Sequence, residues 1–210
     1  MSGCCDNDCA ADVLREKQRG TLIAVLAINA VMFVVILFGA QISGSTALFA
    51  DCLDNLGDAM TYALSLMVVA SSTSAKAKVA LFKGSLILLA ALMVAGQITY
   101  KLFNPEVPVF ALMGAFSLLA LAANSVCLGL LWRHRNEDIN MSSVWECSRN
   151  DIATNISVFI AAGAVWLVGA GWPDIVVASA LVVLLLRSSA RVISGALREL
   201  RGAGTEAHPT

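Results

Sequence analysis

The stretch Thr46–Ala70, TALFADCLDNLGDAMTYALSLMVVA, is long and apolar. It nevertheless carries three aspartates, Asp51, Asp54 and Asp58. About 20 apolar residues cross a bilayer as a helix, and an ionisable group at that depth is costly. The aspartates stand at positions i, i+3 and i+7, which places their carboxylates on one helical stripe. The stretch predicts a membrane helix whose acidic stripe faces a wet cavity or a partner helix and marks an ion pathway.

The composition of the whole chain excludes a soluble protein. Of its 210 residues, 58% are hydrophobic and 14% are charged, and the mean hydropathy is +0.78. Soluble domains average about 45–50% apolar and about 25% charged residues. The formal net charge of −1 produces no field that would attract nucleic acid. We therefore predict an integral membrane protein built as one domain, with no nucleic-acid partner.

Six apolar runs follow one another, separated by short polar or Gly/Pro-containing turns. The predicted fold is an all-α membrane protein with six transmembrane helices, at Thr21–Gly39, Thr46–Ala70, Val79–Leu102, Val107–Trp132, Ile139–Gly169 and Asp174–Leu186. We expect Arg187–Arg201 to form a helical extension or an interfacial amphipathic helix, and Gly202–Thr210 to be disordered. The chain then divides into a tail over 1–19, a six-span domain over 20–187 and a basic tail over 188–210.

The positive charges predict the orientation of these spans. Twelve lysines and arginines would lie on one side of the membrane, and only Lys101 would lie on the other. Cytoplasmic loops carry the excess of Lys and Arg, so both termini should be cytoplasmic. The acidic N-terminal segment does not resemble a secretory signal peptide. We expect a multi-pass protein of a bacterial inner membrane.

A second polar position lies in the fifth predicted span. Cys147 and Asp151 stand at i and i+4, on one face of that helix. Both polar stretches fall near the middle of their spans, which run in opposite directions. Facing each other, they would bring three carboxylates and one thiolate into a pocket, enough for a tetrahedral dication site. The alternative is a structural polar seam between two helices.

These residues resemble a known family of transporters. Ser43–Asp58, SGSTALFADCLDNLGD, is similar to the second-helix signature of the cation diffusion facilitators, a Leu-Ala-Asp lead-in followed by a His/Asp-x-x-x-Asp pair. Cys147–Asp151 stands where that family has its fifth-helix pair. Lys101–Glu106 resembles the connection between its third and fourth helices, and Pro173–Val176 the start of its sixth. The resemblance covers about residues 20–195.

The resemblance implies efflux of Zn²⁺ or a similar dication in exchange for protons, with Asp54, Asp58, Cys147 and Asp151 as ligands of the transport site. Cys147 replaces a His or Asp, and its sulfur would favour Zn²⁺ or Cd²⁺ over Mg²⁺ or Mn²⁺, as in heavy-metal resistance. Only residues 187–210 follow the sixth span, so we expect no cytoplasmic C-terminal domain. The implied partners are the lipid bilayer, metal ions and protons, with a homodimer as the candidate assembly. No cofactor is expected besides the transported ion.

Protons and metal would compete for the same ligands, because these must be deprotonated to coordinate. Such competition in inward- and outward-facing states lets a proton gradient drive metal outward. Asp51 lies one turn before Asp54. It is a candidate proton relay or a group that supports the metal ligands without touching the metal. It is equally a candidate helix-packing acid.

The remaining cysteines fall into two groups. Cys4, Cys5 and Cys9 stand among acids in the N-terminal tail and could capture a soft cation for the transport site. The alternative is a flexible tail whose thiols do nothing. Cys52 and Cys127 are predicted to be small packing residues within the spans.

Other classes of function fit less well. A membrane-embedded module that binds or senses soft metals without transport could use the same ligands. A passive channel would not respond to a pH gradient. The sequence shows no nucleophile–base pair, His-rich cluster or phosphate-binding loop, so we do not expect an enzyme.

Overall fold

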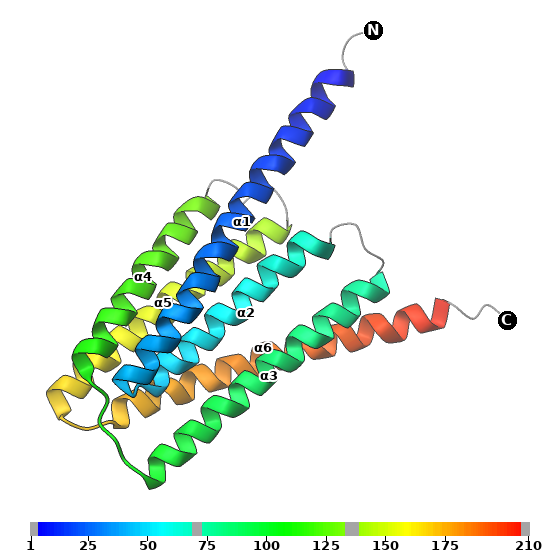
Figure 1. Cartoon of the computed structure of the whole chain (residues 1–210). Helices are drawn as coiled ribbons and strands as arrows, with labels where there is room; N and C mark the ends of the chain where they lie inside the picture. Colours follow the sequence, from blue (N-terminus) through cyan, green and yellow to red (C-terminus); the bar gives the residue numbers. More distant parts are fainter. Residues whose placement is uncertain (1–3, 69–72, 133–138, 207–210) are drawn as a thin grey trace.

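The computed structural model describes the backbone of residues 4–68, 73–132 and 139–206 (Figure 1). Some side chains within these ranges, those of residues 4–18 and of Glu146 and Cys147 among them, lie outside the description. The described residues form helices and short connections. The helices are α1 (Cys4–Ser43), α2 (Thr46–Val68), α3 (Thr73–Phe103), α4 (Phe110–Trp132), α5 (Ile139–Val168) and α6 (Trp172–Glu206).

The predicted all-α class is confirmed, since no strand occurs among the described residues. The helices pack most closely in pairs, α1 with α2, α4 with α5, and α3 with α6. In Figure 1 the first two pairs form a bundle, and α3 and α6 cross beside it. Both chain termini lie at one end of the bundle, opposite the connection over residues 104–109.

Within the described residues, five helices are long and apolar enough to span a membrane by length and composition. These spans are Arg19–Ser43, Ala80–Phe103, Phe110–Trp132, Ser148–Val168 and Trp172–Leu200. The remaining helix, α2, contains the three aspartates within its 23 residues, which lowers its hydropathy. The chain is therefore a multi-pass integral membrane protein in which a helix with three aspartates is packed among the spans.

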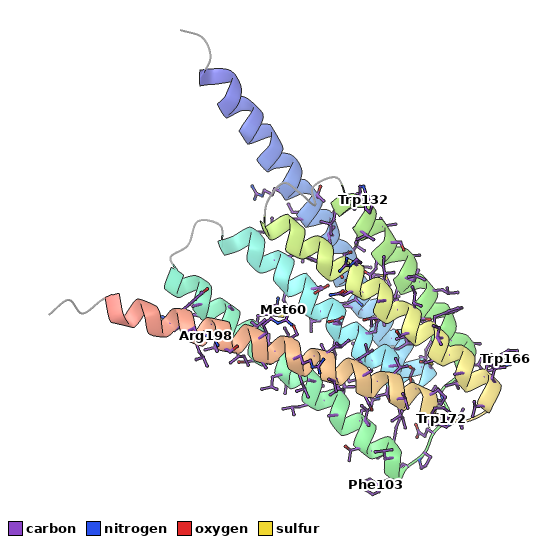
Figure 2. All side chains as sticks on the ribbon, turned by 180° about the vertical axis from the view of Figure 1, so that it is seen from behind. Met60, Phe103, Trp132, Trp166, Trp172 and Arg198 are labelled. Atoms are coloured by element: carbon purple, nitrogen blue, oxygen red, sulfur yellow. The ribbon has the colours of Figure 1, made fainter. Side chains whose placement is uncertain are left out.

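Exposed aromatic side chains mark the two ends of the bundle. Trp132 lies at one end, and Trp166, Trp172 and Phe103 lie at the other (Figure 2). Tryptophan is enriched at membrane–water interfaces. The 23 residues of α4 span about 34 Å at 1.5 Å per residue, slightly more than the roughly 30 Å hydrocarbon core of a bilayer. Large apolar side chains between these ends, Val34 and Leu92 among them, are exposed, as lipid contact requires.

Two helices are longer than their apolar runs. The structure continues α1 back to Cys4, so the N-terminal tail is helical from residue 4 onward. Likewise α6 runs without interruption through the basic segment Arg187–Arg201 to Glu206, which confirms the helical extension. The predicted disorder of Gly202–Thr210 is wrong over residues 202–206, and residues 207–210 lie outside the description. Hydropathy locates membrane crossing, whereas helix formation continues wherever no residue breaks it.

The fourth helix begins later than predicted. Residues 105–109 have no regular structure, and α4 starts at Phe110 rather than at Val107. A residue that precedes proline avoids helical geometry, and Val107 precedes Pro108. The backbone N–H of Val109 instead donates to the Ser43 carbonyl at 2.8 Å. This connection therefore joins the start of α4 to the end of α1.

Glycines allow two close helix approaches. A Cβ on Gly84 of α3 would lie 2.6 Å from Ile193 Cγ1 of α6, and Ser189 Oγ donates to the Gly84 carbonyl at 2.8 Å. A Cβ on Gly39 of α1 would lie 2.4 Å from the Phe116 ring of α4. Small residues of this kind let helices pack closely in membranes. They fix the positions of α6 and α4 around α2.

Candidate functional site

Asp174 organises one end of the bundle. Its carboxylate accepts hydrogen bonds from Ser45 Oγ at 2.6 Å, from the Thr46 backbone N–H at 2.8 Å and from the Ala47 backbone N–H at 3.0 Å. Lys101 Nζ lies 3.7 Å from Asp174 Oδ2 and also donates to the Gly44 carbonyl. Asp174 is fully buried and Lys101 nearly so. We call Ser45, Thr46, Lys101 and Asp174 the Asp174 clasp.

The clasp determines where α2 begins. The first backbone N–H groups of a helix have no partner within it, and an anion stabilises them. Here the anion comes from the first turn of α6, and Lys101 at the end of α3 balances its charge. The N-terminus of α2 is thereby held against α3 and α6. The sequence showed the Pro-Asp pair at residues 173–174 but not the partner of its carboxylate.

The middle of α2 faces the middle of α5. Asp58 and Asp151 are 7% and 8% exposed, and their carboxyl groups lie close enough together to interact directly. A hydrogen bond between two carboxyl groups requires a proton on one of them. When both are ionised, their mutual repulsion requires a bound cation instead. The pair can therefore hold either a proton or a cation.

The other two aspartates of α2 lie near this pair. Asp54 is partly buried and lies within electrostatic reach of Asp58 and of Lys83 on α3. Asp51 is buried, lies near Asp54 and Asp151, and has one carboxylate oxygen without a hydrogen-bond partner. The structure thus gathers the predicted aspartates of both helices into one acidic region, which we call the carboxylate layer (Asp51, Asp54, Asp58 and Asp151).

The predicted thiol ligands lie outside the described side chains. Cys147 occupies α5 one turn before Asp151, and Cys4, Cys5 and Cys9 occupy the first turns of α1. Among the described side chains, no group of three or more His, Cys, Asp or Glu residues lies close enough to hold a metal ion. The ligand set that includes Cys147 therefore stays a prediction.

Buried amides surround the carboxylate layer. Asn55 and Asn155 donate to the backbone carbonyls of Asp51 and Asp151, at 3.0 and 2.8 Å. Three further amide atoms are buried with no hydrogen-bond partner: Asn29 Oδ1, Asn124 Nδ2 and Asn155 Oδ1. Buried polar atoms are almost always paired with protein, water or an ion, so this layer has unused capacity to bind a polar ligand.

Cys127 packs, as predicted, in an apolar cluster with Val25, Tyr62 and Leu131, but it also has polar neighbours. It is fully buried on α4, but its thiol accepts an N–H from Asn29 Nδ2 at 3.9 Å and lies within electrostatic reach of Asp58 and Asp151. Cys52, in contrast, donates to the Phe49 carbonyl of its own helix at 3.1 Å. Cys52 adjoins Asp51 in the sequence, whereas Cys127 stands in an apolar run without acids, so no local signal pointed to Cys127. Only the positions of α1 and α4 bring Cys127 to the acidic region.

The comparison with protein families matches this architecture. Residues 22–201 match the family model of the cation efflux transmembrane domain. The chain belongs to the cation efflux family. This confirms the resemblance to cation diffusion facilitators and supports cation transport as the general activity. The comparison with curated proteins gave no match.

Proposed function

We propose that this cation efflux protein exports a soft divalent ion, Zn²⁺ or Cd²⁺, in exchange for protons. The observation that carries the proposal is the buried contact between the carboxyl groups of Asp58 and Asp151. Asp54 and Cys147 complete the proposed ligand set from positions one turn away on α2 and α5. Three oxygens and one sulfur suit a dication of borderline softness.

Proton exchange follows from the chemistry of this ligand set. A metal ion requires deprotonated ligands, whereas the empty Asp58–Asp151 pair requires a proton to remain stable in an apolar bundle. Each arrival of metal therefore releases protons, and each departure takes them up. When the site opens alternately to the two sides, an inward proton gradient drives metal outward.

The proposed topology has six spans, with α2 as the additional one and both termini in the cytoplasm. The arrangement of helices supports it, because both termini leave one end of the bundle (Figure 1). The basic residues of α6, Arg187, Arg191 and Arg198, also lie toward that end, where Figure 2 labels Arg198. Cytoplasmic segments carry such an excess of arginine and lysine. A bacterial inner membrane supplies the required proton gradient.

Reconstituted vesicles test the proposal directly. Uptake of Zn²⁺, Cd²⁺, Mn²⁺ and Mg²⁺ is measured with and without an imposed pH gradient. We expect Zn²⁺ and Cd²⁺ to cross, and the gradient to accelerate them. Flux that ignores the gradient would indicate a passive channel. Metal binding without flux would indicate a membrane-embedded binding or sensing module.

The sulfur ligand on α5 has its own test. Cys147→Asp keeps the charge of the metal-bound site and replaces sulfur by oxygen, so the uptake ratio of Cd²⁺ to Zn²⁺ should fall while transport continues. Cys147→Ser removes the anionic ligand, so it should weaken transport of every metal and of Cd²⁺ most. A Cd²⁺ to Zn²⁺ ratio unchanged in both variants would remove Cys147 from the site.

A further inference from the structure

Helices α1 and α4 form a wall beside the carboxylate layer. The two helices contact each other, and α4 also contacts α2 and α5. Asn29, Asp58, Cys127 and Asp151 come from four different helices. Counted from the clasp end of each helix at about 1.5 Å per residue, all four lie at a depth of roughly 18 to 26 Å.

The wall presents a buried thiol and a buried amide to that depth. Cys127 is 0% exposed and Asn29 is 1% exposed. Asn29 Nδ2 donates to the Val25 carbonyl at 2.9 Å and to Cys127 Sγ at 3.9 Å. The oxygen of the same amide, Oδ1, has no hydrogen-bond partner. The Asn29 Nδ2 group therefore contacts the thiol, and the oxygen of the same buried amide remains available to a ligand.

A second amide on α4 is also uncommitted. Asn124 lies three residues before Cys127, on the same side of α4. It is 1% exposed, and its Nδ2 has no partner. Isolated buried amide atoms are costly in a membrane protein, since lipid offers no hydrogen bonds. Cys127 packs in an apolar cluster, but its thiol also contacts the Asn29 amide and lies within electrostatic reach of the Asp58–Asp151 pair, so apolar packing does not account for all of its contacts.

We propose that Cys127 and Asn29 form a soft-metal subsite on the α1/α4 wall, next to the carboxylate pair. The thiolate of Cys127 and Oδ1 of Asn29 are its donors, and Asp58 or Asp151 supplies a carboxylate. The subsite therefore combines one thiolate, one carboxylate and one amide oxygen. On metal binding, a metal–sulfur bond replaces the S–H bond, and the proton leaves to water.

The subsite determines which ions proceed to the transport site. Sulfur binds Cd²⁺ and Zn²⁺ more strongly than it binds Mn²⁺ or Mg²⁺. An ion that passes this wall on its way to Asp58 and Asp151 is first selected by binding to Cys127. The proposed transport site, with Cys147 as its sulfur ligand, then selects it a second time. This inference rests on the proposed function for its role in transport, but the binding itself does not require transport.

The test uses purified full-length protein in which Cys4, Cys5 and Cys9 are replaced by Ser, so that only intramembrane thiols remain. Titration with Cd²⁺ is followed by the ultraviolet absorbance of cadmium–thiolate bonds. Cys127→Ser should lower this absorbance and weaken Cd²⁺ binding by at least about tenfold. Cys52→Ser is the matched control, a buried thiol committed to its own helix, and should change neither quantity.

Two results would overturn the subsite. One is absorbance in Cys127→Ser equal to that of the parent, whatever happens to flux. The other is a loss of absorbance that Cys52→Ser produces equally. Cys127→Ala repeats the measurement if the serine variant does not fold. In vesicles, Cys127→Ser should also reduce the uptake ratio of Cd²⁺ to Mn²⁺ relative to the parent.

The outcomes separate this inference from the proposed function. If the parent protein shows the Cys127-dependent absorbance but moves no metal into vesicles, the subsite is supported and the proposed transport is refuted. If the parent protein transports Zn²⁺ and Cd²⁺, and Cys127→Ser changes neither the absorbance nor the selectivity, the proposed transport is supported and the subsite is refuted.

Discussion

The Asp174 clasp and the carboxylate layer are both buried and acidic, but they satisfy their polar groups differently. In the clasp, both carboxylate oxygens of Asp174 accept hydrogen bonds and Lys101 balances the charge. In the layer, Asp51 Oδ2 has no partner, and beside the layer Asn29 Oδ1 and Asn124 Nδ2 have none. Leaving such groups unpaired costs free energy. The charged groups of the clasp are therefore paired without a ligand, although the buried Thr46 Oγ1 has no partner, whereas the Asp51 carboxylate of the layer is not fully paired.

This difference separates a structural polar cluster from a binding one. A completed cluster gains nothing from an ion and holds its helices in one arrangement. An incomplete cluster gains hydrogen bonds or coordination when a ligand arrives, so binding can change its geometry. Substitutions in the clasp should therefore act on stability, and substitutions in the layer should act on metal binding and flux.

The largest effect is expected from the carboxylate pair. Asp58→Ala or Asp151→Ala should abolish transport of every metal, because the dication then sits in a dry site without sufficient negative charge. Asp54→Ala should do the same. Vesicle uptake at equal protein density measures the effect, with the exposed residue Glu106, changed to Gln, as control. Full flux in Asp58→Ala or Asp151→Ala would contradict the assignment of the layer.

Substitutions in the clasp should act on the stability of the protein rather than on metal binding. Asp174→Ala leaves the buried Lys101 without its counter-ion and the first N–H groups of α2 without an acceptor. Breaking a buried ion pair costs about 3–5 kcal/mol, so the protein should denature at a much lower temperature in detergent. Adding Lys101→Met to Asp174→Ala should recover part of the loss. Unchanged thermal denaturation of Asp174→Ala would remove the distinction between the two regions.

A smaller effect should come from an uncommitted amide. Asn124→Leu removes a buried unpaired donor and should raise stability by about 1 kcal/mol while lowering metal affinity. Ser117→Ala on the same helix is the matched control, because Ser117 Oγ is already bonded to the Gly114 carbonyl at 3.0 Å. If Asn124→Leu destabilised the protein more than Ser117→Ala does, its amide would be structural.

The smallest effect should come from the N-terminal thiols. Deletion of residues 1–12 removes Cys4, Cys5 and Cys9 but retains Arg15, Lys17 and Arg19, so the topology should persist. Half-saturation with Cd²⁺ should require several times more metal, with the maximal flux preserved. Concentration-dependent uptake measures both quantities. Complete loss of flux in a correctly inserted truncation would make the segment part of the pathway rather than a capture site.

Much of the fold follows from the sequence because helix spacing and hydropathy are local signals. The spacing of Asp51, Asp54 and Asp58 on one stripe, and of Asp151 in a helix of opposite direction, correctly indicates that these residues approach each other. The boundaries that failed have local causes. Pro108 delays α4, and no helix-breaking residue stops α1 from extending back to Cys4.

The rest depends on which helices are neighbours, and no local signal specifies this. Asp174 lies 128 residues from Thr46 in sequence, and Asn29 lies 98 residues from Cys127. Cys52 adjoins Asp51 in the sequence and Cys127 has no acidic neighbour there, yet both thiols lie within electrostatic reach of aspartates in the structure. The close approaches at Gly39 and Gly84 decide such neighbours. A glycine in an apolar run, however, does not show which helix it will contact.

The long sequence separation within the clasp sets an order for biosynthesis. Ser45 enters the membrane 129 residues before Asp174 is made, which at about 5–20 residues per second takes roughly 6 to 26 s. During that interval the start of α2 has no anion to bind and Lys101 has no counter-ion. The last helix therefore completes the assembly of the first three. A chain that stalls before α6 leaves Lys101 without a counter-ion and the first N–H groups of α2 without an acceptor in the bilayer. Membrane quality control can recognise this defect.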